Sequence, residues 1–275
     1  NSSKGGPTMS HYKHLFGFQR EPFPQDIKVE DLYPLPGLKA LADQFCYALD
    51  LGAISVITGE VGTGKSTSLR YAASPLHPSQ YRIIPVTANT GTILELLKQI
   101  LLSLQIESRS LSITLLTKTL RGIVSEITAK KQQPVLIIDE AHLMRIEIFA
   151  QLHTLLQFDF DSKPLVPLIL CGQNTLIDKL MYHSSRPLAS RVVGRTHLEG
   201  LTLKDMEGYL NHHLKIAGVK EHLFTEEAIL AIQQGSGGLL RRANHLARGA
   251  LVAAALEKNR TVSAEHVRAA STEII

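Results

Sequence analysis

The sequence is poor in cysteine and aromatic residues, and it contains no tryptophan. Its two cysteines, Cys46 and Cys171, lie far apart in apolar surroundings, so we expect two buried, reduced thiols rather than a disulfide. No CxxC pair is present, and the twelve histidines show no metal-ligand spacing. The composition therefore argues against a disulfide-stabilised secreted fold and against a zinc site.

Long apolar runs are also absent. No stretch reaches the roughly 20 residues that a membrane-spanning helix needs, and nothing resembles a secretory signal. We therefore expect a cytoplasmic protein without a membrane partner. The formal net charge of +4 permits a nucleic-acid partner without establishing one. A length of 275 residues allows two domains, or one large α/β domain with an appendage.

The middle of the chain alternates short β-rich runs with longer helical patterns. The predicted strands are Ala53–Thr58, Arg82–Thr87, Val135–Asp139, Pro167–Cys171 and Thr196–Leu198. Apolar residues at helical spacing occupy the stretches between them, at 67–74, 92–106, 112–131 and 146–158. Because the strands are rich in Ile, Val and Leu on both faces, they predict a parallel five-stranded sheet covered by helices.

After about residue 200 the strand signals stop and four helices are predicted, at Leu203–Ala217, Glu226–Gln233, Leu239–Lys258 and Ala264–Glu273. Their expected N-caps are Thr202, Thr225 and Ser263, and their expected stops are Gly218 and Gly235. The resulting domain plan is a cloning remnant at 1–8, an ordered extended lead-in at 9–50 that packs on the site, an α/β domain at 51–200 and a helical lid at 201–275.

A phosphate-binding loop is predicted between the first strand and the first helix. The pattern G-x-x-x-x-G-K-[ST] is matched by Gly59, Glu60, Val61, Gly62, Thr63, Gly64, Lys65 and Ser66, with Thr67 next. Glycines let backbone N–H groups wrap phosphates, and the following helix presents its positive end to them. Lys65 is expected to reach the β- and γ-phosphate oxygens, and the Ser66 hydroxyl to ligate Mg²⁺.

The stretch PVLIIDEAH supplies the acidic partner of such a loop. Four apolar residues end in Asp139, which is placed to hold the magnesium shell, and in Glu140, which is placed to orient and deprotonate a water. This Asp-Glu order favours hydrolysis over phosphotransfer. A third strand ends in Gln173, which we expect to sense the γ-phosphate; an ordinary strand-to-loop amide is the alternative.

Together, GEVGTGKS, LIIDEAH, the LCGQ strand end and the later GLLRRANHLA resemble an AAA+ ATPase. More narrowly they resemble the ExeA/GspA-like group, which overlaps with transposition ATPases of the TniB, TnsC and MuB kind. The N-terminal YKHLFGFQREPFPQDI and LYPLPGL are similar to the lead-in of that group. The resemblance covers the chain from Met9 onward and implies a P-loop AAA+ sheet, a helical lid, ATP and Mg²⁺.

The resemblance also implies further site residues. Arg241 takes the place of the lid arginine that touches the nucleotide; because Leu240 stands where proline is usual, Arg242 remains an alternative. Arg191 resembles the arginine finger given to a neighbouring subunit, with Arg186 and Arg195 as alternatives. The residues expected to wall the adenine pocket are Phe18, Pro22, Phe23 and Tyr33, for which core packing is the alternative.

A finger that acts on a neighbour implies self-assembly into a ring or helical filament. The first functional hypothesis is a regulator that assembles on duplex DNA with ATP and recruits or activates a transposase. The second is a secretion-associated ATPase that acts in secretin assembly, and the third is a DNA-independent switch. The chain stops at Ile275, without the membrane and cell-wall regions of the secretion relatives, which favours the first. The expected DNA contacts are Asn89, Thr90, Lys118, Arg121 and Arg145, to phosphates rather than bases.

Overall fold

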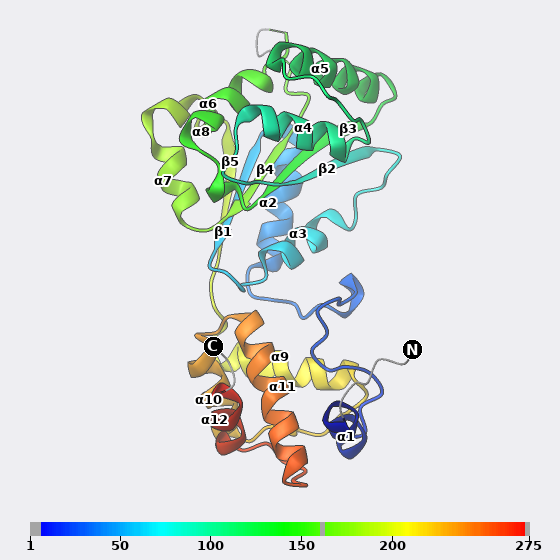
Figure 1. Ribbon diagram of the computed structural model, residues 1–275, viewed down its shortest axis with the longest axis vertical. Helices are drawn as coiled ribbons and strands as arrows, with labels where there is room; N and C mark the ends of the chain where they lie inside the picture. The colour runs from blue at the N-terminus through cyan, green and yellow to red at the C-terminus, as the bar shows by residue number, and fades with distance from the viewer. Residues whose placement is uncertain (1–6, 160–162, 273–275) are drawn as a thin grey trace. The chain divides into compact units, whose positions relative to one another are not determined.

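The computed structural model describes residues 7–159 and 163–272 (Figure 1). The chain forms two compact units, which are described separately. The α/β unit comprises residues 37–60 and 65–198. The helical unit comprises the described residues up to Pro36, the four residues Val61–Gly64, and the described residues from Glu199 onward. The structure therefore divides the predicted lead-in at residue 36 and assigns its two parts to different units.

The α/β unit is built on a parallel sheet of five strands in the order β2-β3-β4-β1-β5. The strands are β1 (Ile54–Gly59), β2 (Tyr81–Thr87), β3 (Gln133–Asp139), β4 (Leu168–Gly172) and β5 (Val192–Leu198). All five predicted strands are confirmed. The edge strand β5 begins at Val192, four residues before the predicted start at Thr196. The prediction was too short because only alternate residues of this strand are buried, so its apolar pattern is weak.

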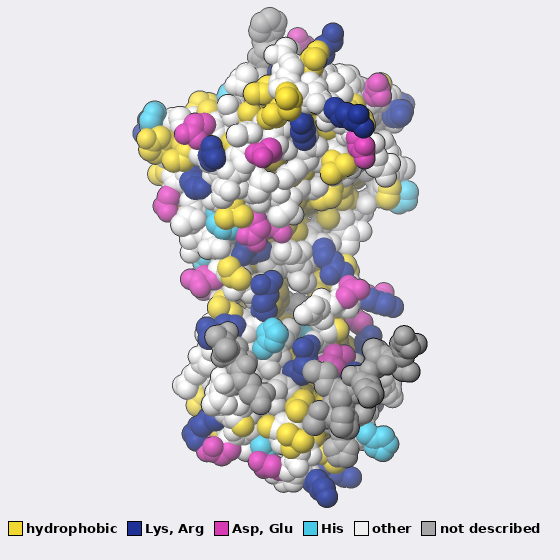
Figure 2. Space-filling model, in the orientation of Figure 1, with side chains coloured by type: hydrophobic (Ala, Val, Ile, Leu, Met, Phe, Trp, Pro, Cys, Tyr) yellow, Lys and Arg dark blue, Asp and Glu magenta, His cyan; other side chains and the backbone are white. Residues whose placement is uncertain are grey.

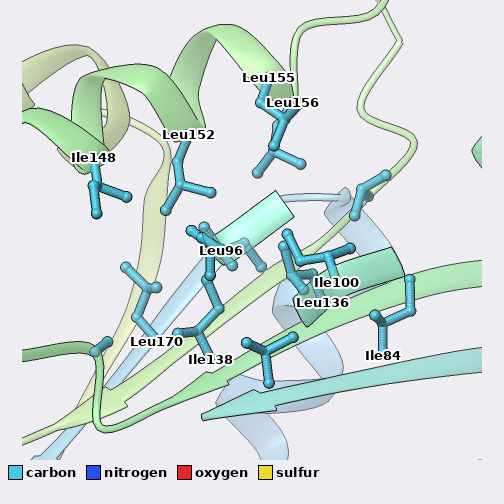
Figure 3. Packing of buried hydrophobic residues seen from close by; sticks show 14 of the residues in the cluster. Ile84, Leu96, Ile100, Leu136, Ile138, Ile148, Leu152, Leu155, Leu156 and Leu170 are labelled. Atoms are coloured by element: carbon cyan, nitrogen blue, oxygen red, sulfur yellow. The ribbon is translucent and has the colours of Figure 1, made fainter. Parts of the chain in front are cut away.

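Alternation of side chains along the central strands fixes two packed faces. Leu136 and Ile138 of β3 point to the face covered by α4 (Ile93–Ser103), α5 (Ile113–Ala129) and α6 (Ile146–Leu155). Figure 3 shows the Leu152 side chain of α6 pointing toward the sheet, with Leu96 of α4 lying between Leu152 and the strands. The short helices α7 (Thr175–Met181) and α8 (Arg186–Ala189) add to the same face.

The other face of the sheet is covered by α2 (Leu38–Leu51) and α3 (Lys65–Ala73). Helix α2 was not predicted because it lies within the segment assigned to the lead-in, although its apolar residues recur at helical spacing. Its inner side is formed by Leu38, Leu41, Phe45, Ala48 and Leu49. Cys171 is buried in β4 as expected, whereas the expectation for Cys46 was wrong: its side chain is exposed on the solvent side of α2.

The helical unit consists of α1 (Pro7–Phe16), α9 (Leu203–Ile216), α10 (Glu226–Ser236), α11 (Leu240–Leu256) and α12 (Ala264–Ser271). The side chains of Thr202 and Thr225 cap α9 and α10, and Ser263 forms a capping box with His266. The predicted stop at Gly235 was wrong, because α10 continues and ends at Gly237, whose φ of +61° suits glycine. Helix α1 begins at Pro7, inside the segment expected to be a remnant.

Candidate nucleotide site

The phosphate-binding loop joins β1 to α3, as the sequence predicts. Gly62 and Gly64 have φ values of +92° and +94°, a conformation that glycine adopts without steric cost. The Lys65 ammonium donates to the carbonyl oxygens of Gly59 (2.9 Å) and Glu60 (2.8 Å), so the side chain folds back over the loop. The loop thus has the glycine backbone and the lysine ammonium that phosphate binding requires.

Ser66 and Asp139 meet although 73 residues separate them. Asp139 has the same parity in β3 as Val135 and Ile137, so its side chain points to the face that carries α3. There the Ser66 hydroxyl donates to Asp139 Oδ2 at 3.1 Å. Two hard oxygen donors suit Mg²⁺, which keeps several waters and binds substrate phosphates instead of filling its shell with protein ligands.

Among residues 7–159 and 163–272, no group of three or more His, Cys, Asp or Glu side chains is arranged to hold a metal ion. Burial and the neighbouring Asp139 carboxylate raise the pKa of the Cys171 thiol, which is hydrogen-bonded to Asp139. The thiol thus stays protonated and supports the carboxylate from the adjacent strand.

Glu140 follows Asp139 with φ +54° and ψ +29°, a left-handed conformation that is uncommon outside glycine. Its N–H donates to Asp139 Oδ1 at 2.8 Å, and the short helix η2 (Ala141–Leu143) begins directly afterwards. Such strained residues cluster at functional sites. The turn separates the two carboxylates, so that Asp139 faces Ser66 while Glu140 continues into the loop beyond the strand.

Gln173 follows β4 at the same edge of the sheet as Asp139, because neighbouring parallel strands end together. Its backbone N–H donates to His142 Nδ1 at 3.3 Å, and that same nitrogen lies 3.5 Å from Glu140 Oε2. The structure therefore brings Gln173 and Glu140 to one histidine. Sequence reasoning missed His142, although its position two residues after Glu140 in DEAH was visible.

Within the helical unit, Arg241 lies against the tip of the phosphate-binding loop. Its backbone N–H donates to the Gly62 carbonyl oxygen at 3.3 Å, and a Cβ built on Gly62 would lie 3.2 Å from Arg241 Cβ. Leu35 of the lead-in is also close, at 3.4 Å from a Cβ built on Gly64. Both Arg241 and Arg242 are exposed, so the contact favours Arg241 without assigning its guanidinium a partner.

The three candidate fingers differ in their surroundings. Arg186 and Arg195 are exposed, whereas Arg191 is half-buried and its carbonyl oxygen accepts from Ile54 N–H at 3.1 Å. Ile54 begins β1 and the phosphate-binding loop follows its end at Gly59, a strand length of about 20 Å. Arg191 thus lies at the opposite end of β1 from the loop of its own chain.

The predicted aromatic wall belongs to the core of the helical unit. Phe23 is 1% exposed, and its ring stacks on His213 with centroids 5.2 Å apart. Tyr33 meets Tyr209 edge to face. We therefore assign Phe23 to core packing and not to the wall of an adenine pocket. Its buried ring, stacked on His213, has no free face for a base.

The expected DNA contacts fall into two groups. Arg145 Nε donates to the Thr90 carbonyl oxygen at 3.0 Å, and the Asn89 side chain accepts from Gly91 N–H at 2.9 Å, so these three residues lie on neighbouring loops. Lys118 and Arg121 lie on α5. The Arg121 guanidinium donates to the Thr154 carbonyl oxygen at 3.1 Å and covers the Phe158 ring.

Figure 2 shows Lys and Arg side chains interspersed with Asp and Glu side chains over the face of the α/β unit in view.

The part of the chain that the structure describes contains no helix with the length and apolar character to cross a membrane.

Comparison with known proteins gives one family and several structures. Residues 50–181 match the family model described as AAA domain. The chain is 30% identical over 245 residues to general secretion pathway protein A of Aeromonas hydrophila, covering 88% of this chain and 45% of that protein. It therefore spans less than half the length of this curated relative.

Three solved structures illustrate the fold similarity. Cdc6p from Pyrobaculum aerophilum has a TM-score of 0.69 at 19% identity, covering 96% of this chain and 71% of that chain. The Aeropyrum pernix ORC1 protein in complex with DNA has a TM-score of 0.64 at 18% identity, covering 90% and 67%. The Thermotoga maritima RuvB Holliday junction branch migration motor has a TM-score of 0.57 at 18% identity, covering 92% and 73%.

Proposed function

We propose that the chain, whose residues 50–181 match the AAA domain model and whose fold is that of a P-loop AAA+ protein, is an oligomeric, Mg²⁺-dependent ATPase. The observation that carries the proposal is the contact between Ser66 and Asp139, which joins the phosphate-binding loop to the acidic strand end. The predicted roles of Lys65, Glu140 and Gln173 rest on their places around this contact.

Each residue has a distinct task in the proposed hydrolysis. Lys65 stabilises the negative charge that develops on the β- and γ-phosphate oxygens. Ser66 and Asp139 would hold a Mg²⁺ ion, which would supply positive charge to offset the charge of the phosphates. Glu140 orients the attacking water and accepts its proton, and the Gln173 side chain contacts the γ-phosphate.

We further propose that Arg191 acts on the nucleotide of a neighbouring copy. Its place at the far end of β1 prevents its guanidinium from reaching the phosphate-binding loop of its own chain. An arginine supplied by a neighbour makes hydrolysis depend on assembly, because its charge reaches the γ-phosphate only when the two copies dock. A head-to-tail contact of this kind generates a ring or a helical filament.

Duplex DNA is the first proposed partner. The support is the fold shared with the DNA-bound ORC1 structure, the net charge of +4, and the grouping of Asn89, Thr90 and Arg145 on neighbouring loops. Recruitment or activation of a transposase remains part of this proposal and rests on the sequence resemblance alone.

A secretion-pathway role is the second candidate, and the similarity to general secretion pathway protein A favours it. The matched region covers 88% of this chain. In this alternative the chain performs the ATP-dependent step of a larger machine and has no need for DNA.

One set of assays tests the activity and separates the partners. ATP hydrolysis is measured with Mg²⁺, with EDTA, and with added random-sequence duplex DNA at several salt concentrations. The proposal predicts Mg²⁺-dependent phosphate release; a preparation that binds ATP without releasing phosphate would contradict it. Stimulation by DNA that disappears at high salt supports the first partner, because phosphate contacts release counterions.

Equal rates with and without DNA, together with no DNA binding at low salt, would remove the first partner and leave the secretion-type role. Arg145→Ala sharpens this test, with Arg82→Ala, an exposed arginine near the start of β2, as its control. Loss of the Arg145 charge is expected to weaken binding to all duplex sequences alike and to lower the slope of log affinity against log salt by about 1.

A further inference from the structure

His142 occupies a place in the site that the proposed hydrolysis does not use. Its ring lies between two strand tips, with Nδ1 3.3 Å from the Gln173 backbone nitrogen and 3.5 Å from Glu140 Oε2. The side chain is only 10% exposed. A nearly buried imidazole that approaches both the proposed base and the backbone of the proposed γ-phosphate sensor can influence hydrolysis through hydrogen bonding.

The two neighbours make opposite demands on one nitrogen. The Gln173 N–H is a donor, so it needs a lone pair on Nδ1. The Glu140 carboxylate is an acceptor, so it can bond only to an Nδ1 that carries hydrogen. In the tautomer protonated at Nε2, Nδ1 accepts from Gln173 and Glu140 gains no hydrogen bond from the ring. In the tautomer protonated at Nδ1, Glu140 is bonded and the Gln173 N–H loses this acceptor.

The ring and the main chain of His142 are each held by close contacts. Gly172 lies against the residue, because an added Cβ there would approach His142 N to 3.0 Å and His142 Nδ1 to 3.1 Å. The Lys179 ammonium of α7 donates to the main-chain carbonyl oxygens of His142 (2.5 Å) and Met144 (2.6 Å). Burial lowers the pKa of Lys179, which agrees with an ammonium enclosed by these carbonyls.

These contacts tie η2, which carries His142, to the β4–α7 connection, which carries Gln173. A shift of either strand tip therefore changes the Nδ1 environment directly. Among the described residues the His142 main chain is thus anchored by α7 and its side chain by the tip of β4.

We propose that His142 is a positioning residue for the hydrolytic base: its Nδ1, held as an acceptor by the Gln173 N–H, keeps the Glu140 carboxylate available to take a proton from water. The inference rests on the proposed ATPase function and deepens it. It assigns the Gln173 backbone, in addition to the Gln173 side chain, a part in hydrolysis.

The first test is the tautomer of His142 in the full chain, read from imidazole ¹⁵N chemical shifts and assigned by comparison with His142→Leu. The expected result is hydrogen on Nε2 and none on Nδ1. Gln173→Ala is the matched control, because it removes the side chain and keeps the backbone N–H; the tautomer should not change. Hydrogen on Nδ1 in the wild type would overturn the inference.

The second test separates positioning from folding by kinetics. His142→Leu is expected to lower kcat by between about tenfold and about 100-fold, the cost of a misplaced catalytic group, with nucleotide affinity and Tm unchanged. His142→Asn should recover part of the rate, because its amide oxygen can accept from Gln173 N–H. His77→Leu, at an exposed histidine before β2, should leave kcat unchanged.

The outcomes distinguish failure of this inference from failure of the proposed ATPase function. A wild type that hydrolyses ATP while His142→Leu keeps the full kcat overturns this inference and leaves the proposed function standing. Equal losses of kcat, affinity and Tm in His142→Leu and His142→Asn also overturn it, because they indicate a structural role. A wild type that does not hydrolyse ATP overturns the proposed function and the inference with it.

Discussion

The two units of the chain use polar side chains in different ways. In the α/β unit the central strands β3 and β4 are apolar on both faces, and Asp139, Glu140 and Gln173 stand where these strands end. In the helical unit, buried polar side chains hold the lead-in: His213 Nδ1 lies 2.7 Å from the Pro22 carbonyl oxygen, and Arg248 donates to the Phe23 carbonyl oxygen. Polar side chains of the α/β unit thus form the proposed reaction site, whereas those of the helical unit hold the lead-in against the helices.

This difference limits what a shifted pKa signifies. Burial lowers the pKa of His213 to about 4 and raises that of Tyr209 to about 12, yet both side chains lie inside the helical unit and pack against each other. Strongly shifted groups are often taken as markers of catalytic sites. Here they lie in the core of the helical unit, where His213 Nδ1 meets the Pro22 carbonyl oxygen and the Tyr209 hydroxyl donates to Asn244 Oδ1.

The largest expected effect tests whether nucleotide binding depends on Lys65 of the phosphate-binding loop. Lys65→Ala removes the ammonium that lies over the loop, and we expect nucleotide binding and hydrolysis to be lost. Equilibrium titration with a fluorescent ATP analogue measures this. Lys130→Ala, an exposed lysine at the end of α5, is the control. Normal affinity in Lys65→Ala would contradict the assignment of the site to this loop.

The next effect concerns the proposed contact between copies. Arg191→Ala is expected to lower kcat by about 10³-fold, because the charge that stabilises the transition state comes from the neighbour. Mixing Arg191→Ala with Lys65→Ala should restore part of the activity, since some interfaces then join an intact loop to an intact finger. Arg186→Ala and Arg195→Ala serve as controls. A mixture as inactive as its components would count against action between copies.

Replacing the proposed base tests whether Glu140 acts in hydrolysis alone, while other residues bind the nucleotide. Glu140→Gln keeps the shape of the side chain and removes its ability to take a proton, so hydrolysis should slow by about 10²- to 10⁴-fold. ATP affinity should persist, because Lys65, Ser66 and Asp139 are intact. Single-turnover phosphate release and nucleotide titration separate the two. A normal rate in this variant would assign the base to another residue.

The smallest effect tests the helical unit through pH. The folded pKa of His213, about 4, lies below the value of about 6.5 for an exposed histidine. The unfolded chain therefore binds the proton first, so the stabilisation is complete above pH 6.5 and is lost as the pH falls toward 4. Between pH 7 and pH 5 the loss is about 2 kcal/mol of unfolding free energy.

Urea unfolding of the wild type and of His213→Phe at pH 7 and pH 5 measures how much of this loss of unfolding free energy is due to His213. The variant should show a smaller drop between pH 7 and pH 5, while His222→Gln, at an exposed histidine, should behave like the wild type. An equal drop in the wild type and in His213→Phe would show that His213 is not the group responsible.

The sequence predicted the α/β unit well because its signals are local. Glycine spacing, the run that ends in Asp139-Glu140 and five apolar strands each specify their own structure, and all five strands are confirmed. The errors have physical causes. Gly235 was taken as a stop because glycine is common there, but Gly237 has the left-handed backbone that ends α10.

Tertiary contacts account for what the sequence did not predict. Nothing near Phe23 in the sequence indicates that His213, 190 residues later, stacks on it. Likewise, His142 gains its significance from Gln173 and Lys179, which come from the following strand end and helix. Such partners are set by the tertiary packing of distant segments, and a single sequence carries no local pattern for them.

The central claim is that hydrolysis depends on contact between copies of the chain. The most direct measurement is the specific ATPase activity, per mole of protein, across a wide range of protein concentrations, with Arg191→Ala in parallel. The account predicts that wild-type specific activity rises with concentration and then levels off, while that of Arg191→Ala stays low throughout. A wild-type specific activity that is independent of concentration and equal to that of Arg191→Ala would contradict it.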